Sequence, residues 1–193
     1  MRTGLVLAIV ATGLTMKVAS AQPATNDGPY IGLAIAQSTF YDVDAGDGTE
    51  IDFNSGSAVR GQVGYGFGSW RAQAEVAYQF VEFEDADDDE FDTDIIRGTL
   101  SLLYDFAPIS MLDSPSPYVG GGIGIANIAV DGEDEDDETG VTFHGELGLT
   151  YDVTDSFALM PQYRFEWFET NEVADIQDNL FSHAFGVAGR YHF

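Results

Sequence analysis

The segment Arg71-Ala-Gln-Ala-Glu-Val-Ala-Tyr-Gln-Phe80 gives the clearest indication of how this chain folds. Its side chains alternate in character: the apolar positions are Ala72, Ala74, Val76, Tyr78 and Phe80, and the others are Arg71, Gln73, Glu75, Ala77 and Gln79. Successive side chains of an extended strand point to opposite faces of a sheet. The stretch therefore predicts a β-strand with one apolar face and one polar face.

The same period of two recurs along the chain between polar inserts. Together with the first stretch it predicts eight strands, at Tyr30–Tyr41, Ser57–Phe67, Arg71–Phe83, Ile95–Phe106, Tyr118–Val130, Val141–Asp152, Phe157–Phe168 and Leu180–Phe193. An even number of antiparallel strands fits a sheet that closes on itself.

The connections between these strands also alternate. Four are long and mostly acidic, at Asp42–Asn54, Glu84–Asp94, Asp131–Gly140 and Glu169–Asn179, whereas Gly68–Trp70, Ala107–Pro117 and Val153–Ser156 carry little charge. Outer-membrane barrels have short periplasmic turns and long external loops. The pattern predicts an up-and-down meander with both termini in the periplasm, although Ala107–Pro117 is longer than a tight turn.

A soluble antiparallel sandwich also alternates, but it scatters basic residues over its loops. Here the charges within the strands keep to the polar parity, which is expected when a narrow barrel is filled by paired polar side chains. This predicted lumen cluster consists of Arg60, Arg71, Arg97, Arg164, Arg190, Glu75, Glu146 and Glu166. An unpaired strand edge cannot be hydrated in hydrocarbon, so a membrane sheet must close. The prediction is an all-β, eight-stranded antiparallel up-and-down transmembrane β-barrel.

Aromatic residues near the predicted strand ends are candidates for the two interfacial girdles of such a barrel. They are Tyr30, Phe40, Tyr41, Phe67, Trp70, Phe80, Phe106, Tyr118, Phe157, Trp167 and Phe193.

The N-terminus has the layout of a secretory signal peptide. Arg2 precedes an apolar run of 13 residues from Gly4 to Met16, and Ala19-Ser20-Ala21 follows. The run is shorter than the roughly 20 residues that a membrane-spanning helix needs. We therefore expect a signal peptide at residues 1–21 and one barrel domain at 22–193.

Composition excludes several classes of protein. The chain has no cysteine, so it has no disulfide and no thiolate metal site. Its formal charge of −26 excludes nucleic-acid binding, which needs a basic surface. No lysine occurs in residues 22–193. We expect no cofactor.

The last strand ends with Phe185-Gly-Val-Ala-Gly-Arg-Tyr-His-Phe193, in which Tyr191 and the terminal Phe193 resemble the C-terminal signal read by the outer-membrane assembly machinery. Tyr30-Ile-Gly-Leu-Ala, Tyr118-Val-Gly-Gly-Gly-Ile-Gly-Ile-Ala and Tyr163-Arg-Phe resemble the porin-family outer-membrane β-barrel domain, a group of small eight-stranded barrels that includes the transmembrane part of outer-membrane protein A. The resemblance covers Gln22–Phe193 and implies an architecture rather than an activity.

Two acidic loops offer the hard oxygen ligands that Ca²⁺ and Mg²⁺ prefer. The weak candidates for divalent-cation contact are Asp87, Asp88, Asp89, Asp134, Asp136 and Asp137. Neither loop has the spacing of an EF-hand. The favoured interpretation is a solvated anionic rim, with divalent cations as the alternative partner.

The lumen cluster allows two interpretations, a plug or a narrow conduction path. An eight-stranded interior is just wide enough for side chains to fill it, which favours the plug. An esterase reading of Ser182-His183 is disfavoured because adjacent strand residues face opposite ways, and the chain contains none of the common catalytic motifs.

These observations predict an integral outer-membrane protein of a Gram-negative bacterium, of structural or surface-interaction type, that is not an enzyme. The alternatives are a narrow porin-like channel and, third, a lipid-modifying enzyme. We expect a monomer whose partners are outer-membrane lipid, lipopolysaccharide and the assembly machinery.

Overall fold

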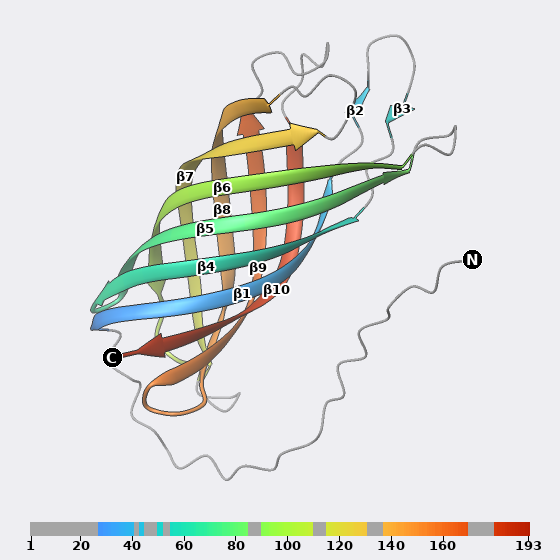
Figure 1. The fold of residues 1–193 in the computed structure, drawn as a ribbon. Coiled ribbons are helices and arrows are strands. Elements are labelled where there is room, and N and C mark those ends of the chain that lie inside the picture. Colours follow the sequence, from blue (N-terminus) through green and yellow to red (C-terminus); the bar gives the residue numbers. More distant parts are fainter. Residues whose placement is uncertain are drawn as a thin grey trace.

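The computed structural model describes residues 27–40, 43–44, 50–51, 55–84, 90–109, 115–130, 137–169 and 180–193. Eight strands close into one antiparallel barrel in the order β1-β10-β9-β8-β7-β6-β5-β4 (Figure 1). They are β1 (Gly28–Phe40), β4 (Ser55–Phe67), β5 (Trp70–Glu84), β6 (Glu90–Asp105), β7 (Ser116–Val130), β8 (Asp137–Asp152), β9 (Phe157–Glu169) and β10 (Leu180–His192). The predicted eight-stranded all-β barrel is confirmed.

Pairing of the first and last strands closes the barrel. The β1–β10 register runs from Tyr30 opposite His192 to Phe40 opposite Ser182. Next to the Tyr30–His192 pair, the Phe193 N–H donates to the Pro29 carbonyl at 3.3 Å. Each of the eight strands therefore has two partners, and the barrel presents no open sheet edge.

Short connections gather at one end of the barrel, which we call the turn end. Between β4 and β5, Gly68 takes a left-handed φ of 68° that favours glycine, and its N–H donates to Asp27 Oδ1 at 2.5 Å. Between β8 and β9, the hydroxyl of Thr154 accepts the N–H of Phe157 at 3.0 Å. Phe193 also lies at this end.

The third connection at the turn end is the one that exceeded a tight turn. Its two limbs keep pairing past the strands, because the Phe106 N–H donates to the Pro117 carbonyl at 2.8 Å and the Ile109 N–H donates to the Pro115 carbonyl at 3.0 Å. Backbone hydrogen bonds therefore hold the two limbs of this connection together where they leave the barrel. Residues 110–114 and the predicted leader, residues 1–21, lie outside the described residues.

At the opposite end, which we call the loop end, the strands run further than their apolar pattern. The β5–β6 register reaches Glu84 opposite Glu90, and β8 begins at Asp137. Main-chain hydrogen bonds extend a hairpin into water without apolar side chains, so a prediction from side-chain alternation ends too early. The strands β2 (Val43–Asp44) and β3 (Glu50–Ile51) also pair here, within the segment predicted as a loop.

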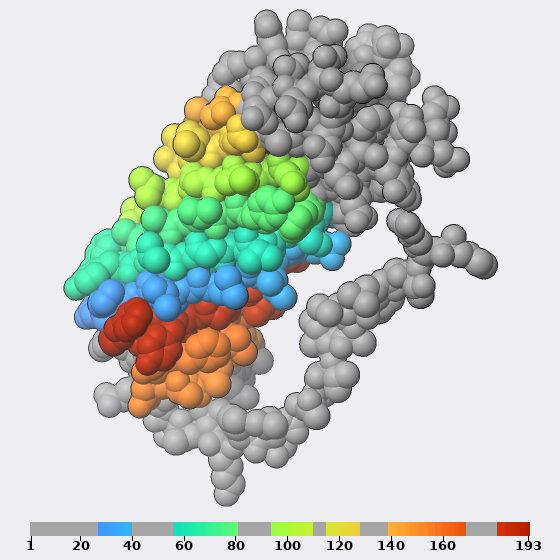
Figure 2. Space-filling view, viewed as in Figure 1, coloured from blue at the N-terminus to red at the C-terminus, as the bar shows by residue number. Residues whose placement is uncertain are grey.

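The two faces of the wall differ as the alternation predicts. Outward side chains such as Leu33, Val76 and Leu100 are more than 60% exposed, and Figure 2 shows the outer wall over β1, β4, β5 and β6 as a continuous surface. A small apolar cluster that includes Leu103 and Met160 lies inside. Most other buried side chains in the barrel are polar or charged. Among the described residues, no helix is long and apolar enough to cross a membrane.

Candidate functional site: the polar lumen

The predicted lumen cluster lies inside the barrel. All eight of its side chains are at most 4% exposed. They come from β4, β5, β6, β8, β9 and β10, and each occupies the inward parity of its strand. Buried charges are stable only when they are paired and hydrogen-bonded, so the pairing of these groups decides what the lumen can do.

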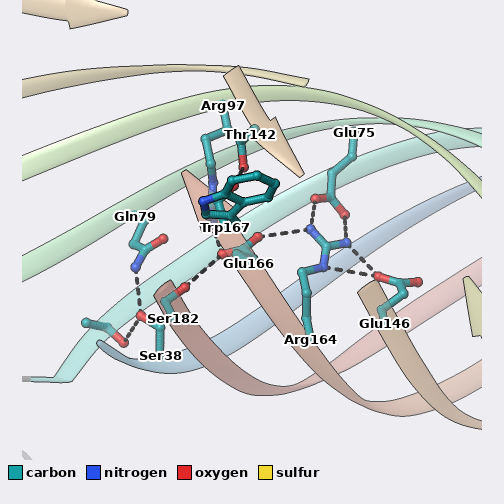
Figure 3. A network of polar contacts seen from close by, with 11 residues as sticks. Ser38, Glu75, Gln79, Arg97, Thr142, Glu146, Arg164, Glu166, Trp167 and Ser182 are labelled. Atoms are coloured by element: carbon teal, nitrogen blue, oxygen red, sulfur yellow. Dashed lines mark hydrogen bonds and ion pairs between the residues drawn. The ribbon is translucent and has the colours of Figure 1, made fainter. Parts of the chain in front are cut away.

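Arg164 on β9 is the centre of the network (Figure 3). Its Nη1 and Nη2 donate to the two carboxylate oxygens of Glu75 at 2.5 and 2.9 Å. Its Nη2 and Nε donate to Glu146 Oε2 at 2.7 and 3.1 Å, and Nη1 lies 3.5 Å from Glu166 Oε1. One guanidinium thus joins carboxylates from three strands: Glu166 is on its own strand, Glu146 is on the neighbouring β8, and Glu75 is on β5 across the barrel.

A second group lies toward the loop end. Arg97 on β6 forms an ion pair with Glu166, which also accepts a hydrogen bond from Ser182 at 3.4 Å. The Arg97 guanidinium carbon lies 5.4 Å from the centre of the Phe168 ring, close enough for a cation–π contact. Glu166 therefore connects the central group to β6 and β10.

A third group lies toward the turn end. Arg71 donates from Nε and Nη2 to the two carboxylate oxygens of Asp105 at 2.7 and 2.9 Å, a bidentate geometry of the stronger kind. Its guanidinium carbon lies 4.9 Å from the Tyr118 ring centre, and that of Arg190 lies 5.5 Å from the Tyr30 ring centre. Two buried tyrosines therefore line this end.

Arg60 differs from the other arginines. Its side chain is buried, yet its Nε and Nη2 have no hydrogen-bond partner among the described residues. It lies opposite Ala34 and Ala77 in the register, where small side chains leave it room.

Among the described side chains, the formal charges of the lumen balance. Four buried carboxylates face five buried guanidinium groups. The half-buried Asp152 on the inward parity of β8 interacts electrostatically with Arg190 and supplies a fifth negative charge. A lumen whose charges cancel offers no field that selects one sign of ion.

A family model described as "Outer membrane protein beta-barrel domain" matches residues 6–193. The chain belongs to this family of outer-membrane β-barrels. Among curated proteins, none matches the sequence.

Solved outer-membrane barrels share the fold. Neisserial surface protein A is 20% identical with a TM-score of 0.66, and the match covers 86% of this chain and 98% of that one. The attachment invasion locus protein Ail of Yersinia pestis, in complex with the heparin analogue sucrose octasulfate, is 16% identical with a TM-score of 0.54, over 86% and 99%. OprG from Pseudomonas aeruginosa is 15% identical with a TM-score of 0.53, over 88% and 99%.

Two of the predicted girdle residues of this outer-membrane barrel are wrong. Tyr30 and Tyr118 are 1% and 2% exposed and point into the lumen. Each packs over a glycine of a neighbouring strand, because a Cβ added at Gly64 or Gly148 would come within 2.3 or 2.6 Å of the tyrosine ring. Among the other candidates, Trp167 is half-buried, the side chain of Phe40 and the whole of Tyr41 lie outside the described residues, and the exposed ones are Phe67, Trp70, Phe80, Phe106, Phe157 and Phe193.

The remaining predicted site residues lie on the lumen face, on the outer face of the barrel, or outside the described residues. Ser182 is buried in the lumen, whereas His183 lies on the outer face and contacts Tyr163. Tyr191 and Phe193 are exposed at the turn end, with ring centres 5.5 Å apart. Side chains of the cation candidates are outside the described residues: Asp87, Asp88, Asp89, Asp134, Asp136 and Asp137. Within the described part of the chain, no group of three metal-ligating side chains gathers.

Asp105 is the main lumen residue that sequence reasoning missed. It follows Arg97 by eight positions on the same parity of one strand, so the alternation that located Arg97 also indicates Asp105. The contact between Gln79 and Ser38 was also missed. The Gln79 side-chain amide donates to the Ser38 hydroxyl at 2.7 Å, and both residues lie on the inward parity of their strands. Small polar residues on an inward parity are a usable signal.

Proposed function

We propose that this outer-membrane protein acts as a non-conducting barrel of structural or surface-interaction type. In this proposal the turn end faces the periplasm and the acidic loops face outward. The observation that supports it most is the central network, in which Arg164 binds Glu75 across the lumen and Glu146 on the neighbouring strand. These side chains occupy the axis along which a solute would have to pass.

The ion pairs of Arg164 also make it costly to open a path through the lumen. Pulling Arg164 away from its carboxylates would leave buried charges without partners, at a cost of about 3–5 kcal/mol. A narrow porin-like channel remains the alternative function.

Single-channel recording in planar bilayers tests the proposal. We expect no discrete conductance steps from the native barrel. The matched control removes the central side chains together, as Arg164→Ala, Glu75→Ala and Glu146→Ala, which keeps the central charge change to one unit and should produce steps. Insertion of both proteins is checked by the mobility difference between boiled and unboiled samples. Conductance steps from the native barrel would establish the channel instead.

The chemistry of the surface favours positively charged partners. Residues 22–193 contain five arginines, all buried in the lumen, and no lysine. The Ail structure holds a polyanionic sulfated sugar, whereas a surface with so few cations repels polyanions. In nanodiscs, the protein should bind a polylysine-coated sensor at low salt and ignore a heparin-coated one. The reverse preference would refute this part of the proposal.

Export and assembly complete the proposal. Residues 1–21 are removed during secretion, and the exposed Tyr191 and Phe193 present an assembly signal at the end of β10. We infer a monomer, because a closed barrel has no sheet edge to share. Replacing Phe193 by Ala should slow insertion without changing the stability of barrels that do insert, which pulse labelling followed by gel mobility would show.

A further inference from the structure

The exterior of residues 22–193 carries a single basic side chain. All five arginines are buried inside, His144 is 6% exposed in the lumen, and His192 occupies the inward parity of β10 beside Tyr30. The remaining base is His183, on the outward parity of β10. An exterior with so many acidic residues has one place where a negative ligand meets a basic group.

His183 is held in a defined setting. The hydroxyl of Tyr163 on β9 is hydrogen-bonded to its Nδ1, and the ring centres of Phe165 and Tyr163 lie 5.3 and 5.5 Å from its own. A neutral imidazole that accepts a hydroxyl proton at Nδ1 carries its own proton on Nε2. The group is then a hydrogen-bond donor, and protonation makes it a cation.

Polar side chains continue the site on the other side of β10. The outward residues of β1 change from apolar at Ile35 to polar at Gln37 and Thr39, both exposed. Thr39 is opposite His183 in the register, and Ser57 of β4 is opposite Gln37. Uncompensated polar groups are costly in hydrocarbon. This row, which we call the polar seam (Gln37, Thr39, Ser57 and His183), therefore fits the headgroup level of the membrane.

The other side of His183 is aromatic. Phe165 and Phe181 stack with ring centres 5.7 Å apart, and Phe181 stacks on Trp167 at 6.4 Å. Aromatic rings of this kind settle where hydrocarbon meets headgroups. The base thus lies between an aromatic surface at the interfacial level and a row of hydroxyl and amide groups.

We infer that His183, positioned by Tyr163 and accompanied by the polar seam, binds the anionic phosphate headgroup of a membrane lipid. The inference rests on the membrane location in the proposed function, but it is independent of whether the lumen conducts. Chains of this lipid would extend toward the turn end, along Phe185 and Tyr163, whose ring centres lie 4.9 Å apart.

Tryptophan quenching provides the test, since the chain has two tryptophans. In a Trp70→Phe background, Trp167 is the single reporter and lies next to the aromatic surface. The full mature protein is reconstituted in phosphatidylcholine vesicles that contain brominated phosphatidylcholine or brominated phosphatidylglycerol. The ratio of Trp167 quenching by the two brominated lipids then gives the preference for the anionic lipid next to the aromatic rings. With His183 in place, we expect a preference for the anionic lipid of about twofold or more. For His183→Arg we expect about fivefold, because the attraction between one surface cation and anionic lipid corresponds to about this factor.

The controls separate this site from general attraction. His183→Gln should reduce the preference to about onefold on the same scale, whereas His192→Gln, inside the barrel, should keep it. With Trp167→Phe, the remaining Trp70 at the turn end should report no preference. An equal preference in native and His183→Gln proteins, or no gain with His183→Arg, would overturn the inference. Gel mobility confirms folding of every variant, and the Arg variant decides the matter if the Gln variant does not fold.

Discussion

Replacing Arg164 by Met should destabilise the barrel more than any other single arginine replacement in the lumen. The side chain forms four hydrogen bonds, two with Glu75 and two with Glu146. Met keeps an apolar stem of similar length but leaves these buried carboxylates without their cation. Breaking a buried ion pair from one side costs about 3–5 kcal/mol in the free energy of unfolding, which is about two to three and a half powers of ten in the equilibrium constant.

Two further variants separate the charge effect from the loss of volume. Glu75 has hydrogen bonds only to Arg164 among those described, so Arg164→Met combined with Glu75→Gln restores the charge balance and should recover about 1–2 kcal/mol. Arg60→Met changes an equally buried arginine that lacks hydrogen bonds at Nε and Nη2. Its cost should stay within about 1 kcal/mol, because removing unsatisfied donors offsets the lost attraction to nearby carboxylates.

Urea unfolding of the reconstituted proteins measures all three values, with tryptophan fluorescence and gel mobility as independent signals. The reasoning would fail if Arg164→Met cost less than Arg60→Met. It would also fail if adding Glu75→Gln made the Arg164→Met protein less stable. In either case volume, rather than the ionic network, would hold the lumen together.

Two further variants test contacts of the lumen, and a binding measurement tests the acidic loops. Gly64→Ala should destabilise by about 1–3 kcal/mol by overpacking, because the new Cβ would meet the Tyr30 ring at 2.3 Å, while Gly61→Ala, with nothing within 4 Å, should be nearly neutral in the same urea assay. Asp105→Asn breaks the bidentate contact with Arg71 and should lower stability by about 3 kcal/mol; a change below about 1 kcal/mol would show that the Tyr118 ring suffices to hold Arg71. Calorimetry with millimolar Ca²⁺ should show no saturable heat, as expected for solvated acidic loops; a saturable signal would establish a divalent-cation site there.

The sequence was sufficient to predict the barrel because the physics of a membrane wall is periodic. Each strand separates lipid from lumen, so Val76 and Glu75 differ in character although they are neighbours. This local rule locates Arg97 and Arg164 on the inward face without knowledge of the partner strands. It also explains why strand ends were less accurate, since pairing continues to Glu84, beyond the predicted strand end at Phe83, where the alternation no longer applies.

The partners of the lumen charges were beyond such a rule. Arg164 and Glu75 are 89 residues apart and belong to strands that are not neighbours in the sheet. Their meeting depends on closure and on the relative stagger of the strands, which alternation does not encode. Tyr30 was misplaced for a related reason, because an aromatic at a strand end suits both a girdle and a cover for Gly64. The small residues on its parity, Ala34 and Ser38, were the available signal.

The long sequence separation of the central ion pairs restricts the order of folding. Glu146 and Arg164 are opposite each other on β8 and β9, so this hairpin brings its own pair together early. Glu75 on β5 and Arg97 on β6 pair with residues that lie 89 and 69 positions later in the sequence, so these contacts wait until distant strands meet. Until then their charges need water, because the hydrocarbon offers none. Insertion should therefore be concerted, with the strands entering the bilayer together as the lumen closes rather than one hairpin at a time.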